Sequence, residues 1–240
     1  MNRLTPLLIA LLGAVIGGVA VYLGSSRLTG ATGDQARIEQ VVHDYLLSHP
    51  EVLPAAMDAL RDKEHAKTIA DNRAAILEPV GSAWAGSAHP DLTIAEYYDY
   101  NCGYCRASLP AIAQLLASDP KLRIVFREFP VLAESSASAA RMSLAAASQG
   151  KFKAFHDSLY AGGQVSEQSI AAAAKLAGVD SANAAAFTPR ADAEIASNMG
   201  VARQLGMTGT PSWVIGNHVV SSALPLETLQ KLVAQARAGG

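Results

Sequence analysis

The chain has 240 residues, of which 17% are charged and 6% aromatic, and its formal net charge is −2. This composition is globular, which excludes a disordered chain, and the near balance of charge gives no reason to expect nucleic acid as a partner. The two cysteines, Cys102 and Cys105, are too few for a small secreted scaffold held together by disulfides.

The first 24 residues predict export. A basic start at residues 1–3 precedes a nearly apolar run, from Leu7 to Leu23, that carries no charge. A run of this length fits both a cleaved signal peptide and a retained membrane anchor, whereas a buried core helix seldom begins at residue 4 behind a basic flank. We therefore expect a periplasmic protein that is either soluble after cleavage or anchored to the inner membrane by residues 4–24.

A small helical module is predicted next. Residues 25–33 are small and polar, as in a linker. Within residues 34–80, the spacing of apolar residues predicts one helix over 34–48 and a second over 50–77. Two helices cannot bury a core of their own, so their apolar faces are expected to pack either on the main domain or on another copy of the chain.

Residues 88–240 alternate between predicted strands and helices. A β-prone strand is predicted over 92–98, a helix over 103–117 with Pro110 inside it, and a second strand over 122–129. Because a helix joins these strands, they are expected to lie parallel. The remaining predicted elements are a helical block over 135–206 with breaks near Gly150, Gly162–Gly163, Gly178 and Pro189, strands over 212–215 and 219–221, and a helix over 226–236. This order predicts an α/β chain of thioredoxin fold with a helical insertion.

The cysteine pair carries the expected chemistry. Cys102 follows a strand and begins a helix, and the unpaired N–H groups at a helix N-terminus favour an anion. A thiol attacks only as its thiolate, so Cys102 is expected to be acidic, exposed and nucleophilic. Cys105 lies one turn further on, faces inward and is placed to resolve a mixed disulfide. Gly103 and Tyr104 add no full charge, so the helix and its hydrogen bonds must stabilise the thiolate.

Other interpretations of the pair stay open. A C-x-x-C pair is half of a zinc site, and histidines would have to supply the other half, although no second pair at ligand spacing exists. A purely structural disulfide would restrain little of the unfolded chain, because its loop is short. Copper(I) suits soft thiolates, so a copper-binding protein is the rival class. We expect no metal and no cofactor other than the redox-active disulfide Cys102–Cys105.

Two further features favour redox chemistry. Glu96 lies among apolar residues six positions before Cys102, where a buried carboxylate would relay a proton for Cys105; the alternative is a glutamate at a sheet edge. Pro211 follows Thr210 just before an apolar strand, and cis peptide bonds are largely a proline feature. A cis Pro211 would turn the Thr210 backbone toward the cysteines, where an unfolded substrate would pair as an added strand. The alternative is a plain proline at a strand entry.

Three segments resemble the DsbA-like branch of thioredoxin-fold proteins. They are YDYNCGYC over 98–105, FREFP over 126–130 and GTPSWVIG over 209–216. The match extends from about residue 88 to the C-terminus. The segment over 38–60 is similar to the N-terminal region of ScsC-type proteins, the suppressor-of-copper-sensitivity group.

This resemblance implies a periplasmic thiol–disulfide oxidoreductase with Cys102 as nucleophile, Cys105 as resolving thiol and Thr210–Pro211 as the cis-proline loop. Some ScsC-type proteins trimerise through their N-terminal region and act as disulfide isomerases. The Gly-Tyr dipeptide between the cysteines looks like that of a periplasmic isomerase and differs from the Pro-His of the oxidase DsbA.

The direction and the partners follow from the same resemblance. We expect isomerase or reductase action on unfolded or misbridged exported proteins, a membrane reductase of the DsbD or ScsB type, and a homo-oligomer, a trimer, formed through residues 34–80. The alternative is an oxidase recharged by a DsbB-like quinone partner.

Overall fold

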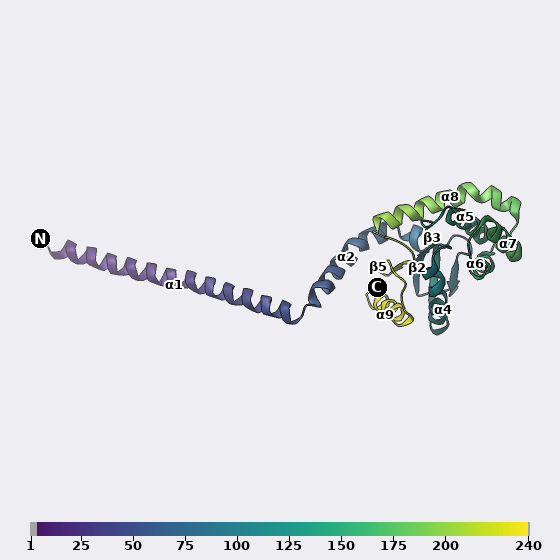
Figure 1. The fold of residues 1–240 in the computed structure, drawn as a ribbon. Coiled ribbons are helices and arrows are strands. Elements are labelled where there is room, and N and C mark those ends of the chain that lie inside the picture. Colours follow the sequence, from purple (N-terminus) through teal and green to yellow (C-terminus); the bar gives the residue numbers. More distant parts are fainter. Residues whose placement is uncertain (1–3, 240) are drawn as a thin grey trace. The chain divides into compact units, whose positions relative to one another are not determined.

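The computed structural model describes residues 4–239, with side chains for residues 12–22 and 34–239 (Figure 1). Residues 1–3, the expected basic start of an export signal, lie outside the described residues. The chain divides between Ala59 and Leu60 into two compact units.

The first unit is dominated by one helix, α1 (Leu4–Ser48). It includes residues 25–33, so the expected break at a linker is wrong: no proline stands between Pro6 and Pro50, and every residue between them keeps the N–H that a helix uses. The helix ends at Ser48, as predicted. Over the described part of the chain, no helix is both long enough and apolar enough to cross a membrane.

The helix expected over 50–77 is instead two helices, α2 (Val52–Asp71) and α3 (Arg73–Leu77). Asn72 separates them, and its side-chain amide donates to the backbone carbonyl of Thr68 at 2.8 Å. The backbone N–H of Asn72 also donates to that carbonyl, at 3.1 Å, and the interruption lies in the Asn72 backbone, whose φ of −110° and ψ of 18° are outside the helical range.

A five-stranded sheet in the order β1–β3–β2–β4–β5 forms the centre of the second unit. The parallel pair of β2 (Leu92–Tyr98) and β3 (Leu122–Glu128) is confirmed. β4 (Ser212–Ile215) is antiparallel to β2 and forms a hairpin with β5 (His218–Val220), also as predicted. β1 (Trp84–Gly86), which pairs antiparallel with β3, was not predicted, because three residues are too short to show an alternating pattern.

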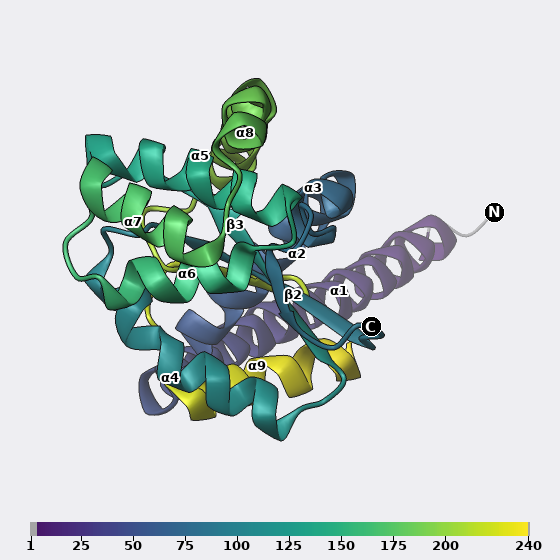
Figure 2. The ribbon, with the colours of Figure 1, turned by 90° about the vertical axis from the view of Figure 1, so that its right-hand side faces the viewer.

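Helices cover both faces of the sheet. They are α4 (Gly103–Ser118), α5 (Glu134–Ser148), α6 (Phe152–Ala161), α7 (Glu167–Ala177), α8 (Ser181–Gln204) and α9 (Leu226–Ala238). α4 and α9 lie side by side on the face that carries Ile94 and Trp213 (Figure 2). α3 and the end of α8 pack on the opposite face, against Ala95 and Val214.

The helical insertion between β3 and β4 consists of α5 to α8. The predicted breaks near Gly150, Gly162–Gly163 and Gly178 are confirmed. Pro189, however, lies inside α8 and does not end it. Proline removes one N–H bond and crowds the carbonyl four residues earlier, but burial of Ala191 and Ile195 against α5 holds the helix that follows it in place.

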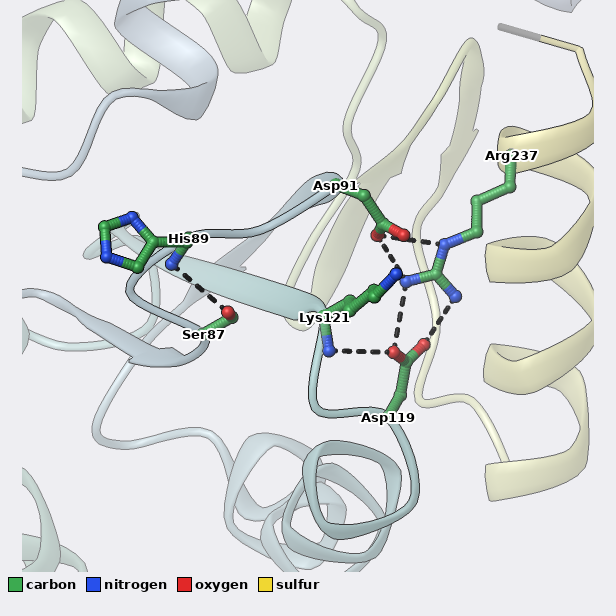
Figure 3. Close-up of polar contacts among 6 residues, drawn as sticks. All are labelled: Ser87, His89, Asp91, Asp119, Lys121 and Arg237. Atoms are coloured by element: carbon green, nitrogen blue, oxygen red, sulfur yellow. Dashed lines mark hydrogen bonds and ion pairs between the residues drawn. The ribbon is translucent and has the colours of Figure 1, made fainter.

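Two arginines join distant elements of this unit. Arg127 is buried in β3, where its guanidinium donates to the backbone carbonyls of Ile76 and Glu78 and to the Glu194 carboxylate. Arg237, in the last turn of α9, donates to Asp91 at 2.7 Å and to Asp119 at 2.6 Å (Figure 3). The Arg127 contacts join α3 and α8 to β3, and the Arg237 contacts join α9 to the segments that precede β2 and β3.

Candidate active site

Cys102 lies between the end of β2, the central strand, and the start of α4. β2 ends at Tyr98, three residues form a loop, and Cys102 is the N-cap residue of α4, with extended backbone angles. The Cys102 Sγ accepts a hydrogen bond from the backbone N–H of Cys105 at 3.2 Å. A helix N-terminus supplies unpaired N–H groups and partial positive charge, and the Cys105 N–H is one such group that reaches the Cys102 sulfur.

The expectation that Cys102 is exposed is wrong. Its side chain is 4% exposed, whereas its neighbour Tyr104 is 72% exposed. The cause is the loop before β4, whose Thr210 carbonyl oxygen lies 3.2 Å from the Cys102 Sγ and accepts a hydrogen bond from the thiol. The attacking sulfur therefore lies directly against the 210–211 loop.

The peptide bond between Thr210 and Pro211 is cis, as the sequence analysis expected. This bond directly precedes β4, and the loop presents the Thr210 carbonyl to the sulfur. The Thr210 hydroxyl is buried and has no hydrogen-bond partner among the described residues.

Cys105 is buried one turn inside α4 and, like Cys102, is a free thiol. Burial raises the pKa of the Cys105 thiol, and the nearby Glu96 carboxyl raises it further. Because a thiol with a raised pKa holds its proton, Cys105 needs a base before it can attack.

Glu96 lies on the central strand of the sheet, so it is not an edge-facing residue. Its side chain is 2% exposed and its backbone pairs with Phe126 on one side and Trp213 on the other. Burial raises the pKa of the Glu96 carboxyl to about 8. A carboxyl of that pKa exchanges its proton near neutral pH.

Asp99 is a site residue that the sequence analysis missed. Its buried carboxylate accepts hydrogen bonds from four donors: the backbone N–H of Asn101 (2.8 Å), Val131 (2.9 Å) and Leu132 (3.0 Å), and the Ser136 hydroxyl (2.7 Å). The bond to the N–H two residues on is typical of a turn begun by aspartate, and that signal was present in the sequence. The other three donors come from the loop after β3 and from α5.

A buried polar cluster behind the site was also missed. It joins Tyr98, Tyr100, Glu128, Ser143 and His156, the last with its Nδ1 3.1 Å from the Tyr100 hydroxyl. Burial raises the pKa of Glu128 to about 8 and lowers the pKa of His156 to about 4, so both side chains are predominantly uncharged at neutral pH. No periodic pattern in the sequence predicts such a cluster, because its members come from four elements.

No group of three or more histidine, cysteine, aspartate or glutamate side chains gathers as metal ligands within the described part of the chain. Of the residues that the sequence analysis singled out, the structure brings together Cys102, Cys105 and Thr210, with Glu96 close enough to influence the Cys105 thiol.

Comparison with protein families gives two matches. The DSBA-like thioredoxin domain matches residues 93–234, which is more than half of the chain. The N-terminal domain of the copper resistance protein ScsC matches residues 34–67. Both resemblances drawn from the sequence are confirmed, and so is the thioredoxin fold.

Three solved structures resemble the chain. A thioredoxin-like oxidoreductase from Silicibacter pomeroyi is 35% identical, with a TM-score of 0.66 over 70% of this chain and 99% of that one. A periplasmic thioredoxin-like protein from Salmonella enterica serovar Typhimurium is 29% identical, with a TM-score of 0.60 over 69% and 95%. ScsC from Proteus mirabilis, in a compact conformation, is 26% identical, with a TM-score of 0.63 over 85% and 98%.

Two curated relatives are much longer proteins. They are Na(+)/H(+) antiporters NhaA, from Salinispora tropica (37% identical over 81 residues) and from Salinispora arenicola (28% identical over 162 residues). The matches cover 12% and 24% of the antiporters, so the chain spans a quarter or less of the length of these relatives.

Proposed function

Because the chain belongs to the family of DSBA-like thioredoxin domains, a family of thiol–disulfide oxidoreductases, we propose that it acts on disulfides of exported proteins as an isomerase or reductase. The observation that carries the proposal is the Cys102 Sγ, which lies at the start of α4, 3.2 Å from the Cys105 N–H and 3.2 Å from the Thr210 carbonyl oxygen. The Cys105 N–H can donate to a thiolate at this position, and the Thr210 carbonyl marks a backbone beside the sulfur on which a substrate can align.

In the first step, the Cys102 thiolate attacks one sulfur of a substrate disulfide. The substrate S–S bond breaks, a bond forms between the Cys102 Sγ and the attacked sulfur, and the departing substrate thiolate takes a proton from solvent. In isomerisation, another thiolate of the same substrate attacks the mixed disulfide and releases Cys102, with no net transfer of electrons. In reduction, Cys105 attacks instead, so the protein is left oxidised and the substrate gains two electrons.

Glu96 would serve the reductive branch. The Cys105 thiol must lose its proton before it attacks. Because the pKa of the buried Glu96 carboxyl is about 8, its ionised form, a minority at neutral pH, is a stronger base than an ordinary carboxylate and can accept that proton. The pKa of Cys105 is raised partly by the Glu96 charge, which indicates that the two groups are close enough to be coupled.

The substrate would bind in extended form along the 210–211 loop. An extended peptide can pair through its backbone with a loop of this kind, and such pairing requires no particular sequence. Gly103, without a side chain, and the exposed Tyr104 would border the substrate at the sulfur and tune the redox potential of the pair. This mode fits unfolded or misbridged proteins, which share a backbone and differ in side chains.

The isomerase or reductase direction rests on the Gly103–Tyr104 dipeptide and on the ScsC-type N-terminal match. It requires that Cys102 be kept reduced by a membrane partner of the DsbD or ScsB type. The second candidate direction is an oxidase, recharged by a DsbB-like quinone partner, which the same dithiol geometry supports.

The N-terminal module would form an oligomer, a trimer in the ScsC manner. Ile38, Val41, Val42 and Tyr45 lie at helical spacing on α1, and each is at least half exposed. Four large apolar side chains on one helical face need a partner surface. Val41→Glu should lower the mass measured by sedimentation, whereas Gln40→Glu, on an adjacent exposed position, should leave it unchanged; equal masses for the two variants contradict the proposal.

A periplasmic location is proposed on two grounds. The apolar N-terminal run suits export, and a similar solved structure is that of a periplasmic protein. A redox-active dithiol in the periplasm has to be supplied with electrons or with oxidising power by a partner.

The decisive experiment has two parts. Alkylation of the protein in intact cells reports whether the pair is held as dithiol, which isomerisation requires, or as disulfide, which would establish the oxidase alternative. Cys105→Ser should then accumulate mixed disulfides through Cys102, and Cys102→Ser should not. If Cys105→Ser traps no substrate while the wild-type protein binds copper(I) stoichiometrically, the chain is a copper-binding protein and the proposal fails.

A further inference from the structure

One backbone carbonyl, that of Asp99, links the attacking cysteine to the helical insertion. The carbonyl oxygen accepts a hydrogen bond from the Cys102 N–H at 3.0 Å and another from the Tyr160 hydroxyl at 3.2 Å. A carbonyl oxygen has two lone pairs, and both are used here. Tyr160, on α6, therefore contacts the loop that holds Cys102, although it touches neither cysteine sulfur through a hydrogen bond.

The Tyr160 ring is itself held on two sides. It packs against Tyr100 at 5.0 Å and His156 at 4.8 Å between ring centroids. The Arg106 guanidinium lies 5.8 Å from the ring centroid and donates to the carbonyl of Gly163, just beyond α6. Asp99 precedes Cys102 and Arg106 directly follows Cys105, so the segment over 99–106 is joined to the end of α6 at two points, one on each side of the cysteine pair.

The phenol stays protonated and can always donate. Burial raises the pKa of Tyr160, and charges on Cys105 and Glu96 would raise it further. The donor to the Asp99 carbonyl is thus present in both redox states of the pair.

We propose that Tyr160 is a positioning residue for thiol–disulfide exchange: through the Asp99 carbonyl it holds the Cys102 backbone so that the sulfur stays within reach of the Cys105 N–H and of the Thr210 carbonyl. This inference rests on the proposed function. Without the Tyr160 hydroxyl, the loop over 99–102 keeps the Cys102 bond to the carbonyl but loses its tether to the insertion. The thiolate then loses part of its hydrogen bonding, and the reduced form is stabilised less.

Tyr160→Phe tests the proposal because it keeps the ring and its packing. We expect alkylation of Cys102 by iodoacetamide to slow, and the redox equilibrium with glutathione to shift toward the disulfide, each by about three- to tenfold, the range for one lost hydrogen bond. Tyr100→Phe is the matched control: it removes another buried hydroxyl from the same aromatic cluster, but one that bonds to Ser143 and His156, not to the Asp99 carbonyl. It should lower the thermal stability and leave both thiol measurements unchanged.

Arg106→Lys provides a second test that does not depend on a buried residue. Lysine keeps the charge but lacks the planar fork that spans the Tyr160 ring and the Gly163 carbonyl, so the same two measurements should shift in the same direction by a smaller factor. The positioning role is refuted if Tyr160→Phe behaves as wild type in both, or if Tyr100→Phe shifts both equally. A wild-type protein that exchanges no disulfide refutes the proposed function instead.

Discussion

Replacing Glu96 by glutamine should change how the stability of the reduced protein depends on pH. The unfolded Glu96 carboxyl has a pKa of 4.5, whereas burial raises the pKa to about 8 in the folded protein. Between these values the folded state keeps a proton that the unfolded state has lost, so the free energy of unfolding falls as pH rises, by about 1.4 kcal/mol per pH unit. Below 4.5 both states are protonated, and above 8 both are ionised, so the slope vanishes at either end.

Two other buried groups define the best window for the measurement. The pKa of Glu128 is also raised to about 8, so this carboxyl lowers the free energy of unfolding with rising pH as steeply as Glu96 does. The pKa of His156 is lowered from 6.5 to about 4. Between these values its contribution to the free energy of unfolding rises with pH, which offsets the fall caused by one of the two carboxyls. Between pH 6.5 and 8 the two carboxyls act together, and the wild-type slope should be about −2.7 kcal/mol per pH unit.

The assay is urea unfolding of the reduced protein at several pH values in that window. Glu96→Gln should halve the slope and be the more stable protein at pH 8, by about 5 kcal/mol for a shift from 4.5 to about 8. Glu128→Gln should halve the slope as well. Only Glu96→Gln should also slow the resolution of a Cys102 mixed disulfide, on the order of a hundredfold for a lost general base. A wild-type slope retained in Glu96→Gln would show that the pKa of this carboxyl is not raised, and a carboxylate of ordinary pKa would be too weak a base for the proposed proton relay.

Three further substitutions test how the site is supported. Asp99→Ala removes the acceptor of four hydrogen bonds and should cost about 3 kcal/mol in urea unfolding; a loss below that of one hydrogen bond would mean that solvent replaces the carboxylate. Arg127→Met leaves the partly buried Glu194 without its cation and should also cost about 3 kcal/mol, so an unchanged urea midpoint contradicts the anchoring of α3. Arg237→Gln removes ion pairs to two part-exposed carboxylates and should cost less than about 1 kcal/mol, a loss that should shrink further with added salt.

Much of the site was predictable because it is local in the chain. The strand over 92–98, the start of α4 after Cys102 and the cis bond before Pro211 each depend on a few neighbouring residues, and their patterns are visible in the sequence. The spacing of Cys102 and Cys105 sets their relation within one helical turn, since an N-cap side chain meets the N–H three residues on.

Only the tertiary structure decided what surrounds these local elements. Cys102 is buried, not exposed, because a carbonyl 108 residues further along the chain lies on its sulfur. Glu96 carries a raised pKa because β2 lies between β3 and β4. Tyr160 meets the Asp99 carbonyl because α6 folds back over the loop before α4. Amino-acid spacing specifies which helix and strand each residue joins, but exposure, pKa and hydrogen-bond partners depend on long-range packing, which places residues together regardless of their separation in sequence.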